Sequence, residues 1–494
     1  MAMLLLALGQ ERQWQLLLAL LTMVFLVVIA RNSSSSKAKQ GLKHKHPPGP
    51  AMLPVLGNLH QVGGLPHRSL QELAWRHGPV MLLWLGTVRT VVVSSAEAAK
   101  AVMKTHDVDC CSRPASPGPK RLSYDLKNLL FAPYGVYWRE MRKLFMVELL
   151  SMRTGAAAFG SVYGADQFPH KGRFQEVLDE AMDMMASFSA EDFFPGTGGR
   201  LVDRLTGLLG RRERVFKDLD AFFELNIEQH LDPARPKPDN GGDLVDVLIG
   251  LWKEQHSTVR FTKDHVKAII LDTFIGAIDT SSVTMLWAMS ELIRKPRILS
   301  KVQEEIRAMV GRNHFWRVKE DHVPNLTYLK MVVKETLRLH PPATLLVPRE
   351  TMKPLEIGGY DVPAKTRILV NAWAIGRDPL SWGSDSEEFN PDRFHDSDID
   401  FNGAHFQLLP FGAGRRICPG LAMGVMNVEF TFANLLYCFD WALLEGMPPK
   451  NVSMEEAGAL TFHRMAPLIL VPTPQGDSSA NMHFTSLASN YVLN

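Results

Sequence analysis

The longest uninterrupted helical pattern in the chain runs from Phe261 to Pro296, and it constrains the fold most. Its sequence, FTKDHVKAIILDTFIGAIDTSSVTMLWAMSELIRKP, predicts one helix of more than thirty residues. Thr262 is a suitable cap at its start, Arg294 and Lys295 suit its C-terminus, and Pro296 ends it. The core must therefore be organised around a long helix.

Other segments extend this mainly helical pattern. Helices are expected over 296–310, over 326–339 before His340-Pro341-Pro342, and from about Pro419 to Tyr437. Residues 79–94 are β-branched and hairpin-like, and 343–370 resemble short strands with turns at Gly358-Gly359 and Val362-Pro363. The sequence predicts a mainly α fold with a minor β part and no internal repeat.

The composition excludes several classes of protein. The chain has 494 residues, of which 46% are hydrophobic and 21% charged, so it is globular. A net charge of +2 predicts no nucleic-acid partner. Four cysteines without a C-x-x-C pair form neither a disulfide framework nor a structural zinc site, so the main body suits a reducing compartment.

The N-terminus predicts a membrane anchor. The segment from Trp14 to Ala30 is almost unbroken apolar sequence, close to the ~20 residues that span a bilayer. Basic residues follow it (Arg31, Lys37, Lys39, Lys43 and Lys45), which places that end, and the main domain, in the cytosol. A cleaved signal peptide is the alternative, but RNSSSSK lacks a small-x-small cleavage site. We assign 1–31 as a single-pass anchor and 32–50 as a basic, Ser-rich linker with a Pro-rich hinge.

The segment PFGAGRRICPG, residues 410–420, surrounds one cysteine with glycines and arginines. Pro419 suits the first turn of a helix, so Cys418 is expected at a helix N-terminus, where the dipole, Arg415 and Arg416 lower a thiol pKa. A lone thiolate suits one open metal position, with haem iron the obvious candidate. The alternative is a buried structural cysteine beside a Gly-rich turn.

This loop carries the pattern F-x-x-G-x-R-x-C-x-G, from Phe411 to Gly420. Together with FAPYG-x-x-W-R at 131–139, KETLRLHPP at 334–342, the anchor and the Pro-rich hinge, it resembles the cytochrome P-450 family of haem-thiolate monooxygenases, in particular the plant endoplasmic-reticulum branch. The resemblance covers nearly the whole chain. It implies a catalytic domain over 51–473 with haem b held by Cys418, in a loop shaped by Phe411 and Gly414.

The resemblance also assigns supporting residues. Trp138 and Arg142, in W-x-x-x-R, with Arg416 and Arg349, are expected to hold the haem propionates; the alternative is that the arginines are solvent-exposed. Alone, Glu335 and Arg338 in E-x-x-R would be a routine surface ion pair. The family instead joins them to the arginine of P-x-R-F, here Arg393, in a structural lock behind the haem.

Asp279 and Thr280 lie in the middle of the long apolar helix, where polar side chains are costly unless they are satisfied or used. One interpretation is local bonds to the backbone. The family resemblance instead places Thr280 over the haem with Asp279 feeding a proton relay. Ala277 replaces the glycine that is common in A-G-x-D-T, which narrows the expected oxygen groove.

The implied activity is insertion of one atom of O2 into a small hydrophobic substrate. The chain has no G-x-G-x-x-G fingerprint after a strand, so NADPH is expected to act only through a cytochrome P-450 reductase at the endoplasmic reticulum membrane. MEEAGALTFHR, residues 454–464, resembles grass enzymes that hydroxylate indole-derived, benzoxazinoid-type defence compounds. The expected pocket offers apolar residues that are equally ordinary core residues: Leu129, Phe131, Ile275, Ala343, Thr344, Leu345 and Phe462.

Two further hypotheses remain open from the sequence. One is a haem-thiolate isomerase or lyase of fatty-acid hydroperoxides, against which Asp279-Thr280 and the anchor argue. The other is a non-catalytic relative, because some tens of residues usual in the family are missing near 153–154. Residues 472–494 also run past the usual end of such chains, and 474–494 are expected to form a loosely ordered polar tail.

Overall fold

The computed structural model describes residues 45–149, 171–187, 189–235, 242–255, 259–311, 318–444, 446–458 and 460–475. The predicted anchor, all but the end of the linker, the junction at 153–154 and the tail after Gln475 lie outside the described residues.

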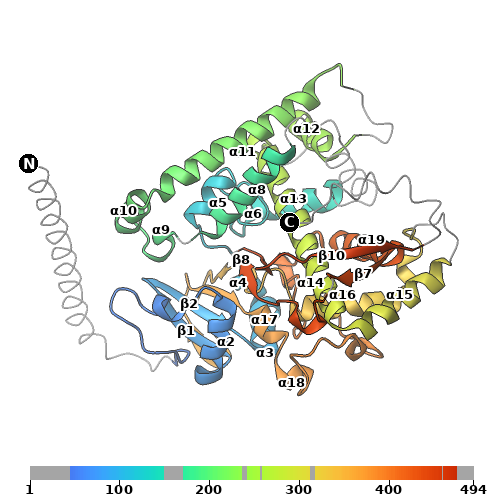
Figure 1. Ribbon diagram of the computed structural model, residues 1–494. Coiled ribbons are helices and arrows are strands. Elements are labelled where there is room, and N and C mark those ends of the chain that lie inside the picture. Colours follow the sequence, from blue (N-terminus) through green and yellow to red (C-terminus); the bar gives the residue numbers. More distant parts are fainter. Residues whose placement is uncertain are drawn as a thin grey trace, which may run out of the picture.

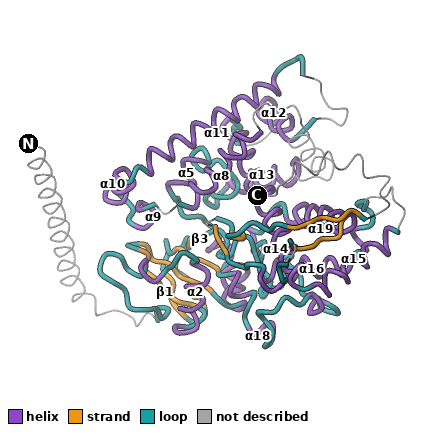
Figure 2. The backbone as a smooth tube through the Cα atoms, in the orientation of Figure 1, coloured by secondary structure: helices purple, strands orange, loops and turns teal. Residues whose placement is uncertain are grey.

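Helices make up most of the described chain, and the strands form a few short sheets among them (Figures 1 and 2). The helices before the long helix are α2 (Pro66–His77), α3 (Ala96–Lys100), α4 (Asp107–Cys110), α5 (Pro117–Leu122), α6 (Val136–Leu144), α8 (Lys171–Ala186), α9 (Ala190–Phe193), α10 (Thr197–Leu205), α11 (Leu208–Leu231) and α12 (Leu244–Glu254). Those after it are α15 (Pro296–Val310), α16 (Thr327–Leu339), α17 (Ala372–Ile375), α18 (Pro379–Trp382) and α19 (Leu421–Cys438).

The long helix is confirmed, with one irregularity. It consists of α13 (Lys263–Phe274), a π-helical turn η4 (Ile275–Asp279) and α14 (Thr280–Arg294). Thr262 caps it in a capping box with His265. The π turn falls at the predicted Asp-Thr pair, and such turns are frequent at functional sites.

The hairpin predicted at 79–94 is also confirmed. Strands β1 (Val80–Leu85) and β2 (Val88–Val93) pair antiparallel, with Val80 opposite Val93. The sheet continues with β6 (Arg367–Val370), which is parallel to β2, and β3 (Arg349–Glu350), in the order β1-β2-β6-β3. The other strands form two-stranded sheets: β4 (Leu355–Ile357) with β5 (Tyr360–Val362), β8 (Glu456–Gly458) with β9 (Phe462–Arg464), and β7 (Phe439–Leu443) with β10 (Leu470–Pro474).

The remaining helix predictions agree with the structure within two residues. The helices expected at 296–310 and 326–339 are α15 and α16, and the turn at Gly358-Gly359 joins β4 to β5. The last buried helix begins at Leu421, two residues after Pro419, with Gly420 as its cap residue.

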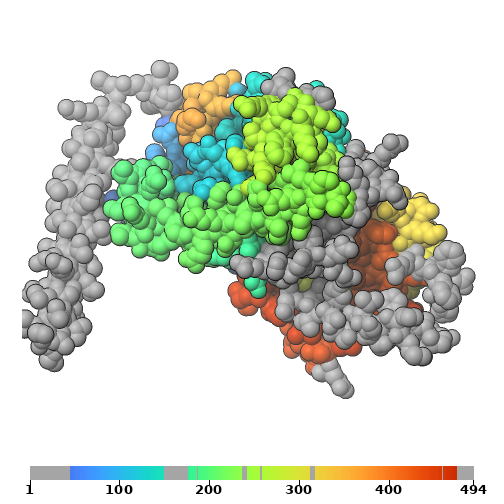
Figure 3. Space-filling view, turned by 90° about the horizontal axis from the view of Figure 1, so that it is seen from above, coloured from blue at the N-terminus to red at the C-terminus, as the bar shows by residue number. Residues whose placement is uncertain are grey.

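The apolar core is divided along the long helix. Around α13, side chains of α5, α6, α8, α11 and α12 form one buried cluster. Around α14, side chains of α15, α16 and α19 form another. Seen from above, α10 to α12 make up the green part of the surface in Figure 3. The long helix therefore carries Asp279 and Thr280 where the two cores meet.

Candidate functional site

The cysteine loop is held by its own backbone. The Cys418 N–H donates to the Phe411 carbonyl at 3.0 Å, and the Phe411 ring packs edge-on against Phe401. Gly414 has φ of +70°, and a Cβ there would lie 2.3 Å from the Met103 carbonyl oxygen. Only glycine fits this left-handed and crowded position. The predicted role of Gly414 thus has a steric basis.

The expected lowering of the Cys418 pKa is wrong for the free thiol. Burial raises the pKa of Cys418, and this outweighs the Gly420 N–H and the Arg142 charge, which act in the opposite direction. The two arginines before the cysteine serve other groups: Arg415 pairs with Asp107 at 3.1 Å, and Arg416 faces away into backbone carbonyls. Thiolate formation here must be driven by a ligand that binds the sulfur.

The structure brings Trp138, Arg142 and Arg416 together beside the cysteine loop. Arg142 donates to the Ile417 carbonyl at 2.8 Å, and the Arg416 guanidinium lies 4.1 Å from the Trp138 ring centre. Arg416 also donates to the carbonyls of Cys111, Leu129 and Ala132. The Trp138 indole donates to the same Leu129 carbonyl at 3.0 Å.

Arg349 approaches the same loop from the sheet. It is buried on β3, donates to the Ala413 carbonyl at 2.8 Å and pairs with Asp107 at 3.1 Å. Asp107 was not expected from the sequence; it also accepts from the Arg415 backbone N–H at 2.9 Å. A lone aspartate in a short helix gives no sequence signal, because its partners lie more than 240 residues away.

The charge around the loop suits a dianionic group. Arg113, also missed individually, is buried beside Arg349 and Arg416, and burial with this mutual repulsion lowers its pKa. For the same reasons the pKa of Arg416 falls to about 9, with Arg349 and Arg142 contributing to the repulsion. Buried cations of this kind need counter-charge. Haem carries two carboxylates that can pair with these arginines, and its iron accepts a thiolate ligand. The cysteine and the buried arginines beside it therefore fit a haem.

Glu335, Arg338 and Arg393 form a buried ion-pair network. Arg338 binds Glu335 through two bonds of 2.7 and 2.8 Å, and Arg393 adds a third at 2.9 Å. Arg338 further donates to the carbonyls of Gly376 and Ser386, each at 2.6 Å. Both charges of the E-x-x-R pair are fully buried, so the surface-pair alternative is excluded.

Asp279 and Thr280 differ in their partners. The Thr280 hydroxyl donates to the Gly276 carbonyl at 2.7 Å, which is the local backbone bond considered as the alternative. The Asp279 carboxylate instead accepts from the Thr461 hydroxyl, in the hairpin between β8 and β9. Thr461 was not predicted individually, although it precedes the predicted pocket residue Phe462 and lies within 454–464, the segment that resembles grass enzymes.

A mostly apolar cavity of about 220 Å³ lies between this hairpin, the loop after α16 and α9. Five of the predicted pocket residues line it: Phe131, Ala343, Thr344, Leu345 and Phe462. Leu129 and Ile275 do not; they are buried core residues. Arg113 holds the wall in place, because it donates to the carbonyls of Val347 and Pro348 at 2.6 and 2.9 Å.

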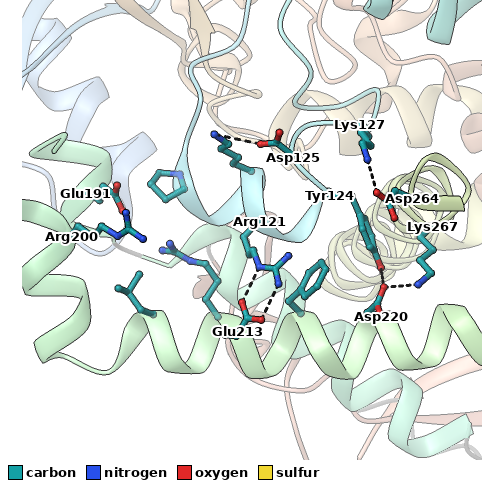
Figure 4. A pocket seen from close by; sticks show the side chains of 15 residues that line it. Arg121, Tyr124, Asp125, Lys127, Glu191, Arg200, Glu213, Asp220, Asp264 and Lys267 are labelled. Carbon is teal, nitrogen blue, oxygen red and sulfur yellow. Dashed lines mark hydrogen bonds and ion pairs between the residues drawn. The ribbon is translucent and has the colours of Figure 1, made fainter. Parts of the chain in front are cut away.

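A second, larger hollow of about 810 Å³ between α5, α11 and α13 is polar (Figure 4). Its charges pair across it: Arg121 with Glu213 at 2.9 Å, Lys127 with Asp264, and Lys267 with Asp220 at 2.6 Å. Cations and carboxylates alternate along its walls, so this hollow has the character of a solvated ion-pair network.

The helical fold, the cysteine loop and the cluster of arginines together define a haem-thiolate protein. The Cytochrome P450 family profile matches residues 47–162 and 153–468, and the chain belongs to this family. It is accordingly an oxidoreductase of the monooxygenase class, whose members use haem.

Named relatives are plant enzymes. The chain is 62% identical to 4-hydroxyphenylacetaldehyde oxime monooxygenase of Sorghum bicolor over 510 aligned positions, covering 94% of this chain and 96% of the relative. It is 46% identical to 2-methylbutanal oxime monooxygenase of Manihot esculenta over 501 positions, covering 93% and 97%. A zebra fish cytochrome P450, in a structure with abiraterone, has the same fold, with a TM-score of 0.63 and 24% identity over 83% of this chain and 100% of that one. The predicted resemblance to grass enzymes is confirmed by the sorghum relative.

Proposed function

We propose that this protein is an oxime monooxygenase of plant specialised metabolism. The observation that carries the proposal is the cysteine loop flanked by buried arginines. The chain also has a small apolar cavity and is 62% identical to an aromatic oxime monooxygenase. The cavity suits a small molecule with one apolar body and few polar atoms.

In this proposal Cys418 ligates the haem iron, and Trp138, Arg142, Arg349 and Arg416 hold the propionates. When bound, a thiolate-ligated haem supplies dioxygen activation, with one oxygen atom entering the substrate and the other leaving as water at the expense of two electrons and two protons. Gly414 keeps the loop tight, and the lock of Glu335, Arg338 and Arg393 keeps the helix behind it in place.

The Asp279 carboxyl and the Thr280 hydroxyl would deliver the protons that this reaction consumes. Asp279 is oriented by Thr461, and Thr280 is oriented by the π turn. Rotation of the Thr280 hydroxyl away from Gly276 would present it to water in the oxygen groove, where Asp279 could pass a proton to it. We assign the electrons to NADPH through a membrane-bound reductase, and the location to the endoplasmic reticulum by a single N-terminal span.

We also infer that this chain lacks a segment that its relatives carry near residues 153–154. Alignments of 510 and 501 positions exceed the 494 residues of the chain, so each relative has residues that match nothing here. The family profile matches in two segments that overlap at 153–162. Loss of such a segment would remove packing surface from the core, and a haem-free, non-catalytic protein is the competing outcome.

The test is to produce the chain in membranes with a cytochrome P450 reductase and to supply 4-hydroxyphenylacetaldehyde oxime and 2-methylbutanal oxime. We expect consumption that requires NADPH and O2, abolished by Cys418→Ala and retained by Cys438→Ala, which changes the other cysteine of that region. A haem-loaded protein that consumes neither oxime would overturn the proposed substrate class. A protein without haem would favour the non-catalytic alternative.

A further inference from the structure

Two of the residues that line the apolar cavity each carry a buried oxygen with no hydrogen bond to any described residue. Thr344 is 2% exposed, and within the described residues its hydroxyl has no hydrogen bond. Oδ1 of Asp192 is likewise buried without a hydrogen bond among these residues, although the carboxyl group also interacts with Ser116 and Arg367. Both residues line the cavity. An unpaired buried donor or acceptor destabilises the protein, so such atoms in a cavity are expected to meet a ligand or water.

Hydrogen bonds hold the backbone of both residues in place, so the two unpaired oxygens cannot readily move to find a partner in the protein. The loop that bears Thr344 is held by Arg113 and by the Trp373 N–H, which donates to the Thr344 carbonyl at 3.1 Å. Helix α9, which bears Asp192, is tied to the sheet: Thr87 donates to the Phe193 carbonyl at 2.8 Å, and Arg367 to the Asp192 carbonyl at 3.3 Å. Asp192 and Thr344 can therefore act as a preformed polar edge of the cavity, called the selection edge below.

The remainder of the cavity is apolar and of limited size. Its other walls include two aromatic rings and several aliphatic side chains: Phe131, Met185, Leu345, Val347, Leu460 and Phe462. An engineered protein cavity of about 150 Å³ binds benzene, so about 220 Å³ accommodates one ring with a few further atoms. A large polycyclic ligand is too big, and a short aliphatic chain would leave the polar edge unpaired.

The cavity also connects to the proton-handling pair. Leu460 and Phe462 are the neighbours of Thr461, whose hydroxyl binds Asp279 at the π turn. One side of the cavity therefore adjoins the reacting region, while Asp192 enters from α9. A ligand with a reactive group at one end and a hydroxyl at the other would place the first near Asp279 and the second near Asp192.

We propose that Asp192 and Thr344 select an aromatic aldoxime that bears a ring hydroxyl over aldoximes that lack one. The phenolic O–H donates to the Asp192 carboxylate, and the Thr344 hydroxyl bonds the phenolic oxygen. This inference rests on the proposed oxime monooxygenase function and names the substrate within it. A site built to bond a substrate hydroxyl discriminates strongly against the analogue without it, because its own polar atoms are then left unpaired.

The experiment compares two ligands that differ only in the hydroxyl: 4-hydroxyphenylacetaldehyde oxime and phenylacetaldehyde oxime. Their dissociation constants are measured on the full chain in membranes by equilibrium dialysis, and substrate-induced changes in the haem spectrum give a second readout. We expect the natural chain to bind the hydroxylated oxime at least about tenfold more tightly, the effect of one or two hydrogen bonds.

The variants are Thr344→Val and Asp192→Ala, with Thr344→Ser and Glu191→Gln as matched controls. Thr344→Ser keeps the hydroxyl, and Glu191 is the neighbouring acid of α9 that does not line this cavity. We expect Thr344→Val and Asp192→Ala to lose most of the preference while binding phenylacetaldehyde oxime at least as tightly as the natural chain does, which also verifies their folding. The controls should keep the preference.

Two results separate this inference from the proposed function. If the natural chain binds and oxidises both oximes equally, or if Thr344→Val and Asp192→Ala keep the original ratio, the selection edge is refuted and the oxime monooxygenase stands. If the natural chain binds haem but neither oxime, the proposed function falls, and the selection edge falls with it.

Discussion

The ion-pair lock and the apolar cavity treat buried polar groups in opposite ways. In the lock, Glu335 accepts hydrogen bonds from Arg338, Arg393 and the Asn390 backbone N–H. Arg338 also donates to backbone carbonyls. In the cavity, Thr344 and Asp192 each keep a buried oxygen that has no hydrogen-bond partner in the part of the chain that the structure describes. Both regions are tied to the frame of the molecule, yet only one is complete by itself.

This difference indicates which region supports the fold and which receives a ligand. A fully satisfied network holds elements together and gains nothing from a small molecule. An incomplete edge in an apolar setting costs stability until a ligand pairs with it. Perturbing the first should damage the whole molecule, whereas perturbing the second should change only recognition.

The largest effect is expected from Arg338→Leu. Glu335 would remain buried without its main partner, which costs about 3–5 kcal/mol. Chemical or thermal unfolding of the membrane-extracted protein measures this loss. Lys301→Ala, which removes a half-exposed pair with Asp392, should cost less than about 1 kcal/mol. Equal losses in the two variants would contradict the account of the lock.

The next largest loss of stability, about 2–4 kcal/mol, is expected from Gly414→Ala. This change adds a side chain at a φ of +70° and 2.3 Å from the Met103 carbonyl oxygen. Haem content per protein and the unfolding midpoint both report it. The control is Gly420→Ala, whose Cβ would meet nothing within 4 Å. If Gly414→Ala behaved like Gly420→Ala, the close approach of the cysteine loop to the Met103 carbonyl would be refuted.

Acid should weaken the hairpin that carries Thr461. Burial alone would raise the Glu456 pKa, but the bonds from His67 and Arg68 bring it down to about 2, from an ordinary value of 4.5. A depressed acid pKa contributes stability that is complete above about pH 4.5 and lost as the pH falls toward 2. This shift corresponds to a contribution of about 3 kcal/mol to the free energy of unfolding.

The unfolding free energy of Glu456→Gln should therefore vary less between pH 5 and 3 than that of the natural chain. Glu455→Gln, which changes the exposed neighbour, is the control and should leave the slope unchanged. An unaltered slope in Glu456→Gln would show that this buried carboxylate does not govern the acid response.

The smallest effect is expected from Thr461→Val. It removes the hydroxyl that binds the Asp279 carboxylate. The loss of one hydrogen bond corresponds to a roughly two- to tenfold change in the step that depends on it. The readout is the fraction of consumed NADPH that is recovered as oxidised substrate, which should fall, while the dissociation constant of the substrate stays nearly constant. Thr461→Ser should restore the fraction. If Thr461→Val only weakened binding, Thr461 would be a pocket residue without influence on Asp279.

Local features of the sequence predicted the elements well. Thr262 and Pro296 delimit the long helix, and the turn at Gly358-Gly359 depends on neighbouring residues alone. The π turn was not foreseen, because its geometry follows from packing at the junction of two cores. The Asp279–Thr461 bond, across 182 residues, was equally invisible to reasoning along the chain.

For the site, motif residues were found but their surroundings were not. The pattern from Phe411 to Gly420 located the cysteine loop, whereas the direction of the Cys418 pKa shift depended on burial, which spacing does not reveal. Asp107 and Asp192 belong to no motif, and their importance follows from what lies next to them in space.

The central claim, that Cys418 holds a haem in this chain, is tested most directly by a reduced carbon-monoxide difference spectrum of the protein made in membranes. The account predicts a strongly red-shifted Soret band that disappears in Cys418→Ala and persists in Cys438→Ala. No band, or an unshifted one, in the natural chain would contradict it. If inserting the sorghum relative's additional residues after Arg153 then produced the band, the claim would hold for the longer chain alone.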